Sequence, residues 1–240
     1  MTAPSIYGYI TGSDAVGTNS VSVVVPSSTF VDGQTVYIPI ASDAPDASQF
    51  STPSRFTALY SNKQVSQAIF NATASVFKQA NILKANESFS SPNYTFTIAC
   101  NTLERQAWFF ISIDNDGGIG AQGTDASASS STATVPGLTT TANNSLVMGI
   151  VFGDQIVTPF GTPSGYTKLD EVSNTSGASV GVFYQTVATA GTVISDQTLS
   201  LGASRAWRGI SFEIKALVTG GLIYPARMDG LGRFFRGLDS

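Results

Sequence analysis

The sequence contains no histidine and only one cysteine, Cys100, among its 240 residues. Without histidine no Ser-His-Asp triad can form, and zinc sites of the usual Cys/His type are excluded as well. A single cysteine cannot form an internal disulfide, so the composition gives no sign of an oxidising compartment. We therefore expect neither triad catalysis nor a zinc site of this type.

Charge is also scarce, with 12 Lys and Arg against 16 Asp and Glu and a net charge of −4. Such a balance argues against a broad surface for nucleic acid or anionic lipid. No stretch approaches the roughly 20 apolar residues of a membrane span. The first residues, Met1 to Ile6, lack the basic start and apolar segment of a signal peptide. We expect neither a nucleic-acid partner nor a membrane.

What the chain does contain is an internal repeat. Val25-Pro26 recurs as Val135-Pro136, and Thr52-Pro53-Ser54 recurs at the same spacing as Thr162-Pro163-Ser164. Farther on the spacing shrinks while the order is kept, which indicates that the second copy has shorter loops. The later matched pairs are Val76-Phe77-Lys78-Gln79 with Val182-Phe183-Tyr184-Gln185, and Ala107-Trp108 with Ala206-Trp207. Repetition of this kind predicts two similar units of about a hundred residues each.

Both copies have the pattern of β-structure. Short runs rich in Val, Ile, Phe and Tyr alternate with turns of Gly, Pro, Asn, Asp and Ser. Asp32-Gly33 and Asn143-Asn144 stand at matching turns, where a residue of positive φ is needed. We predict an all-β protein of two tandem antiparallel β-sandwiches, jelly-roll-like, with repeat 1 at residues 21–116 and repeat 2 at 132–216.

Three segments lie outside the repeats in this interpretation. They are an N-terminal arm (1–20), a Gly/Ser linker (117–131) and a C-terminal docking tail (217–240). The tail is basic in an acidic protein, and its large apolar residues would be an aggregation hazard unless they docked on a partner. The residues expected to make that contact are Leu222, Ile223, Tyr224, Arg227, Met228, Arg233, Phe234, Phe235 and Arg236.

Two short motifs suggest ligands but lack the context that they need. Gly118 to Gly123 fits the G-x-G-x-x-G pattern of dinucleotide sites, yet no helix pattern follows it, so we interpret it as a flexible linker. Asp114-Asn115-Asp116-Gly117 resembles the start of a calcium loop, but only Asp125 follows and no closing Glu does, so a solvated turn is expected.

The remaining candidates are carboxylates and aromatic residues. A glycosidase needs two carboxylates, but none of those present forms a motif, and Glu213 is expected to face solvent or a salt bridge. Trp108 and Trp207 are expected in the cores. Phe50, Tyr60 and Phe160 are expected as exposed loop aromatics, with Phe50 and Phe160 as possible glycan contacts.

Taken together, several motifs resemble a loosely defined group of duplicated β-sandwich proteins encoded among bacteriophage structural genes. These are V-x-V-P, an Asp-Gly turn before an apolar strand, T-P-S-x-[FY]-T-x-L, and A-W-x-x-[IF]-S at the end of a copy. The resemblance covers roughly residues 20 to 216 and is better in the second copy. The first copy departs from it, with Arg55 where the second has Gly165 and a longer insertion around Lys84 to Asn93.

The resemblance implies a virion component that is not an enzyme, and with it we expect no catalytic residues, no metal and no cofactor. Our first expectation is a capsid decoration or cement protein, a homo-oligomer whose arms bind the major capsid protein or other virion proteins. The alternative is a tail-fibre or head-fibre adhesin that binds host-surface carbohydrate. A third interpretation, a polysaccharide depolymerase, requires a carboxylate pair.

Overall fold

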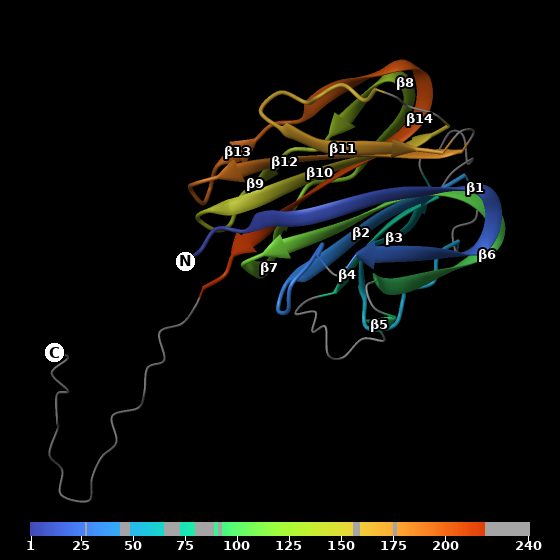
Figure 1. The fold of residues 1–240 in the computed structure, drawn as a ribbon. Coiled ribbons are helices and arrows are strands. Elements are labelled where there is room, and N and C mark those ends of the chain that lie inside the picture. Colours follow the sequence, from blue (N-terminus) through green and yellow to red (C-terminus); the bar gives the residue numbers. More distant parts are fainter. Residues whose placement is uncertain are drawn as a thin grey trace, which may run out of the picture.

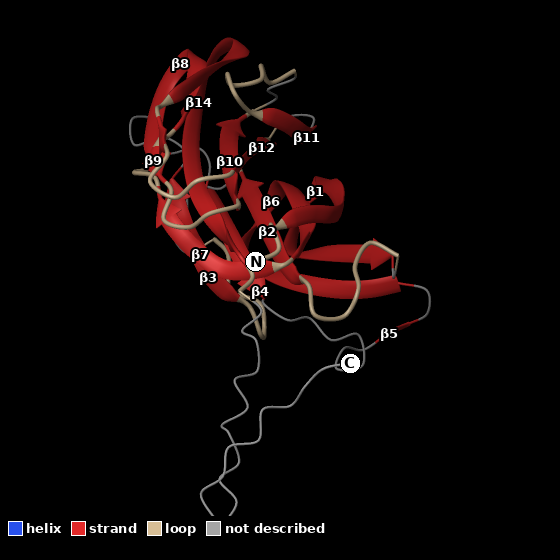
Figure 2. Ribbon diagram, turned by 90° about the vertical axis from the view of Figure 1, so that its left-hand side faces the viewer, coloured by secondary structure: helices blue, strands red, loops and turns tan. Residues whose placement is uncertain are grey.

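The computed structural model describes residues 1–26, 28–43, 49–64, 73–79, 89–90, 93–155, 159–174 and 177–218. Within these ranges the chain consists of strands and loops and contains no helix (Figure 2). All strand pairs are antiparallel. The all-β class predicted from the turn and strand pattern is therefore confirmed.

Two six-stranded sheets make up most of the fold. The first sheet contains β1 (Ser5–Pro26), β2 (Thr35–Ser42), β3 (Thr57–Gln64), β4 (Thr73–Gln79), β5 (Phe89–Ser90) and β6 (Asn93–Asp114). The second contains β7 (Asp116–Gln122), β8 (Ala126–Val135), β10 (Ser145–Asp154), β11 (Thr167–Ser173), β12 (Ala178–Val187) and β14 (Gln197–Ala216). A small third sheet pairs β9 (Leu138–Thr139) with β13 (Val193–Ile194).

The strand orders of the two large sheets follow the same scheme. The strand order of the first sheet is β1-β6-β2-β4-β3. Read from the corresponding edge, the order of the second sheet is β7-β14-β10-β12-β11, and β8 also pairs with β14. β1 pairs along both halves of β6, whereas β7 and β8 pair with successive halves of β14. β7 and β8 thus take together the place that β1 takes alone.

Two of the three segments predicted to lie outside the repeats, the N-terminal arm and the Gly/Ser linker, are largely built into these sheets. Residues 5–20 belong to the long strand β1, so they do not form a separate N-terminal arm. Residues 117–131 fall mostly in β7 and β8, so the prediction of a flexible Gly/Ser linker is wrong. Small residues suit these strands because the strands cross closely over side chains of β14, as described below.

The two large sheets pack face to face, in the two layers seen in Figure 1. The central core between them unites Tyr37, Phe109 and Ile111 of the first sheet with side chains of β10, β12 and β14. Tyr37 stacks on Phe212 across this boundary, with ring centroids 5.5 Å apart. The two large sheets therefore share one hydrophobic core.

Each sheet also has a core on its other face. β1 and β6 bend together near the bulges between Asp14 and Ser20, and their outer halves cover the first sheet (Figure 1). Trp108 lies in this first outer core and Trp207 in the corresponding core of the second sheet. Both are nearly buried, so the prediction that the tryptophans pack in cores is confirmed.

Candidate functional site

Glu213, on β14, is the most fully bonded carboxylate in the described part of the chain. Its side chain is completely buried. Its partners are backbone N–H groups and hydroxyls, which donate hydrogen bonds to it, and not a Lys or Arg side chain. Ser145 Oγ and Thr141 Oγ1 lie 2.5 and 2.7 Å from its oxygens. The N–H groups of Ala121, Thr141 and Ala142 donate at 2.9–3.0 Å. The expectation of a solvent-facing or salt-bridged Glu213 is therefore wrong.

This arrangement keeps Glu213 ionised in spite of its burial. Burial by itself would raise the pKa of the carboxyl, but the hydrogen bonds from Ser145, Thr141 and Ala121 outweigh it and lower the pKa to about 2. The donors come from β7 and from the segment formed by the turn before β10 and the first residue of β10, Ser145. Glu213 therefore fastens both segments to β14, and its role is structural.

Two of the glycines that resemble a dinucleotide motif, Gly120 and Gly123, are explained by their closeness to side chains of β14. A Cβ on Gly120 would lie 2.0 Å from Oε2 of Glu213, and one on Gly123 would lie 2.3 Å from Oγ of Ser211. Both distances are shorter than any side chain tolerates. These glycines therefore let strand and loop approach β14 closely, and they do not open a helix that could receive a phosphate.

The acidic turn compared above with a calcium loop is used to join the sheets. Asp116 on β7 accepts a hydrogen bond from the hydroxyl of Tyr37 at 2.7 Å. It also forms an ion pair with Lys78, with an N···O distance of 3.2 Å. Burial, with the charge of Asp116 beside it, raises the pKa of Tyr37 far above its usual range. Asp114 accepts from Gln34 at 2.7 Å. Neither carboxylate is the solvated turn residue that the sequence suggested.

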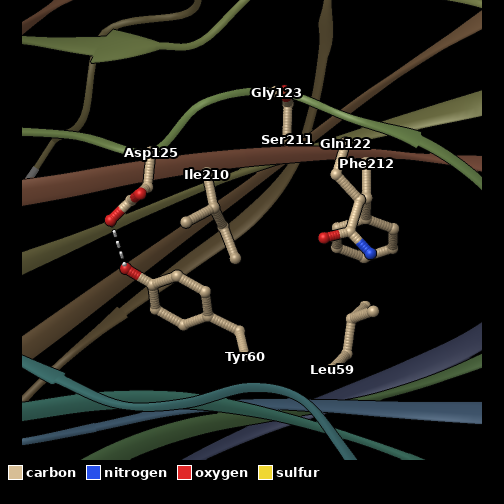
Figure 3. Close-up of a pocket in the computed structure, with 8 residues that line it drawn as sticks. All are labelled: Leu59, Tyr60, Gln122, Gly123, Asp125, Ile210, Ser211 and Phe212. Atoms are coloured by element: carbon tan, nitrogen blue, oxygen red, sulfur yellow. Dashed lines mark hydrogen bonds between the residues drawn. The ribbon is translucent and has the colours of Figure 1, made fainter.

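A cleft in which polar and apolar groups meet opens between the two sheets (Figure 3). Its volume is about 170 Å³. It is lined by Leu59 and Tyr60 of β3, by Gln122, Gly123 and Asp125 of the β7–β8 connection, and by Ile210, Ser211 and Phe212 of β14.

Tyr60 and Asp125, which line one side of the cleft, form a cross-sheet cluster with Arg208. Tyr60 OH donates to Asp125 Oδ2 at 3.3 Å, and Arg208 Nη1 lies 3.2 Å from the same hydroxyl. Arg208 also forms an ion pair with Asp125. Burial raises the pKa of Tyr60, while Arg208 opposes that rise and Asp125 adds to it. The hydroxyl is therefore a neutral hydrogen-bonding group and not a base.

The aromatic residues expected as glycan contacts are not on the surface. Phe50 and Phe160 are only 3% and 2% exposed, and each belongs to an outer core. Phe160 lies against Gly181, where a Cβ would come within 3.1 Å of its ring. Sequence reasoning misplaced both because a loop position does not prevent a side chain from turning inward. Only Tyr60 of the three is partly exposed, and it stands on strand β3.

Sequence reasoning did not connect the groups that form the cleft. Tyr60, Asp125 and Arg208 are distant in the chain and share no motif, so nothing local in the sequence brings them together. The nine residues expected to dock, from Leu222 to Arg236, lie outside the described residues, and their role stays a prediction. Among the described residues, no group of three or more Cys, Asp or Glu side chains is placed to hold a metal ion.

Comparison of this chain with protein-family models, with curated proteins and with solved structures finds no match. The described part of the chain has no helix with the length and apolar character to cross a bilayer. Arguments about function therefore rest on the residues themselves.

Proposed function

We propose that this protein is a structural component of a bacteriophage particle, and specifically a capsid decoration protein that binds the head through its C-terminal tail. The motifs shared with duplicated β-sandwich virion proteins are the first support for this proposal. The second is the way in which the fold uses its buried carboxylates. Glu213 and Asp116 hold segments together, as a protein with a mechanical role requires.

The observation that carries the proposal is the position of the root of the tail. Thr2 pairs with Leu217, and the N–H of Thr2 donates to the carbonyl of Leu217 at 3.3 Å. The start of the chain and the start of the tail therefore lie at one end of the molecule (Figure 1).

The same end exposes apolar side chains. Met1 is 67% exposed, Val218 is 65% exposed and Leu217 is 38% exposed. The sequence beyond Val218 adds Tyr224, Met228, Phe234 and Phe235, together with three arginines. Apolar anchors rimmed by arginine are the composition of protein interfaces, so a protein partner fits this end better than solvent does.

Binding to phage heads that lack this protein tests the proposal. Full-length protein should co-sediment with such heads, and a variant carrying Phe234→Ser and Phe235→Ser should bind at least about tenfold more weakly, because aromatic anchors dominate interface energies. Val24→Ser, which removes an exposed valine from β1, serves as the control and should bind normally. Equal binding of the tail variant and the wild type would reject the tail as the docking element.

A further inference from the structure

The cleft between the sheets differs from the buried clusters because its groups face an open space. Figure 3 shows the side chains of Tyr60 and Ile210 on one side and those of Leu59, Gln122 and Phe212 on the other. Gln122 and Asp125 are exposed, and Leu59 and Tyr60 are partly exposed, so a molecule in solution can reach the lining. Ile210 and Phe212 are buried and form its apolar floor.

The size of the cleft limits what can enter. A cavity of roughly 150 Å³ in another protein admits benzene, so about 170 Å³ admits one six-membered ring. Drug-sized ligands occupy pockets of about 300 Å³ or more. The cleft is therefore suited to a single ring and not to an extended cofactor.

The charge within the cleft favours a neutral ligand. The negative charge of Asp125 is already neutralised by its ion pair with Arg208. Asp125 makes its contacts with Arg208 and Tyr60 through the same oxygen, Oδ2. Oδ1 takes part in neither of them. A cation would be repelled by Arg208 and an anion by Asp125, whereas a hydroxyl can donate to Oδ1 without changing the ion pair.

We propose that this cleft binds one neutral sugar ring. A pyranose has apolar C–H faces and a rim of hydroxyls, which matches apolar walls beside two exposed polar side chains. One C–H face of the ring lies against Tyr60 and the other against Leu59, while ring hydroxyls donate to Asp125 and exchange hydrogen bonds with the amide of Gln122. An apolar side chain of a partner protein would fill the walls but would desolvate Asp125 and Gln122 without replacing their hydrogen bonds, which is costly.

The test uses the full-length protein and three methyl glycosides, those of glucose, galactose and N-acetylglucosamine. Saturation-transfer NMR and chemical-shift titration should detect at least one of them with a Kd of about 1 mM, the affinity expected for a ligand of that size. No binding at concentrations about twentyfold above that Kd would overturn the proposal.

Two cleft variants and one control locate the site. Gln122→Ala removes an exposed amide and should weaken binding about fivefold, the loss of one neutral hydrogen bond. Leu59→Trp fills the cleft and should abolish binding. Gln197→Ala removes an amide that bonds to Ser195, outside the cleft lining, and should leave binding unchanged.

The two cleft variants are read together with circular dichroism, which reports whether each has folded. Sugar binding that survives in a folded Gln122→Ala protein at full strength would contradict the proposed site, even if Leu59→Trp failed to fold. This proposal does not depend on the C-terminal tail. Head-binding and sugar-binding can therefore succeed or fail separately.

Discussion

Arg55 and Gly165 adopt nearly the same left-handed backbone, with φ of 68° and 77°. Each follows a Thr-Pro-Ser sequence and precedes a buried aromatic residue, Phe56 or Tyr166. In both turns the N–H of that aromatic residue donates to the carbonyl of the proline, at 3.1 and 3.2 Å. The departure of Arg55 from the motif is therefore a change of side chain at an unchanged backbone conformation.

The backbone cost at Arg55 is measured by two replacements that remove the same side chain. A non-glycine residue in the left-handed region costs about 1 kcal/mol relative to glycine. Because Arg55→Gly and Arg55→Ala lose the same contacts of the arginine, the glycine variant should have the higher free energy of unfolding, by about 1 kcal/mol in urea denaturation. Gly165→Ala should lower the free energy of unfolding by about 1 kcal/mol. An Arg55→Ala protein as stable as Arg55→Gly would contradict this explanation.

Glu213→Gln should be strongly destabilising. The amide is nearly isosteric, but its NH₂ group would face N–H donors of Ala142, Thr141 or Ala121, leaving buried groups unpaired. We expect a loss of about 3 kcal/mol in the free energy of unfolding. Asp196→Asn is an acid-to-amide change at an exposed residue whose Oδ1 can still accept from the N–H of Gly137, so it should change stability by less than about 0.5 kcal/mol. Equal losses in the two variants would refute the structural role of Glu213.

The stability contributed by Glu213 should depend on pH in a defined window. Its pKa in the folded protein, about 2, lies below the ordinary value of 4.5. The stabilisation is therefore fully present above pH 4.5 and is lost as the pH falls from there towards 2, by about 3 kcal/mol in total. The difference in unfolding free energy between wild type and Glu213→Gln should shrink over that range. A difference that stays constant from pH 6 to about 2.5 would contradict the assigned pKa.

Gly120→Ala tests the close approach of β7 to the same carboxylate. The added methyl group would occupy the position of Oε2, so Glu213 must move and lose hydrogen bonds. The expected loss is about 3 kcal/mol, with thermal unfolding as the measurement. Because both changes disrupt one cluster, adding Gly120→Ala to Glu213→Gln should cost clearly less than the sum of the two single effects. Strict additivity would show that Gly120 matters for another reason.

The local patterns of the sequence were sufficient for the class of fold and for several turns. Gly33 and Asn144 both have positive φ, as their matching turn positions predict. Trp108 and Trp207 are core residues because each stands in an apolar run on a strand. These inferences succeeded because they depend on neighbours along the chain.

The failures concern contacts between distant residues. Gly118 to Gly123 looks flexible by composition, but Gly120 is required by its closeness to Glu213 and Gly123 by its closeness to Ser211, each about 90 residues away along the chain. Alternation on β14 correctly separates Glu213 from the face of Phe212 and Ile214. It could not show that this other face is covered by β7 and the turn before β10. For the same reason no sequence pattern could predict the contact between Tyr60 and Asp125.

The most direct test of the proposed function is electron cryomicroscopy of intact phage particles that carry this protein. Our proposal predicts density on the outer surface of the head that fits the two packed sheets, with the end marked by Thr2 and Leu217 directed at the capsid shell. Absence of the chain from purified particles, or density confined to the tail tip, would contradict it.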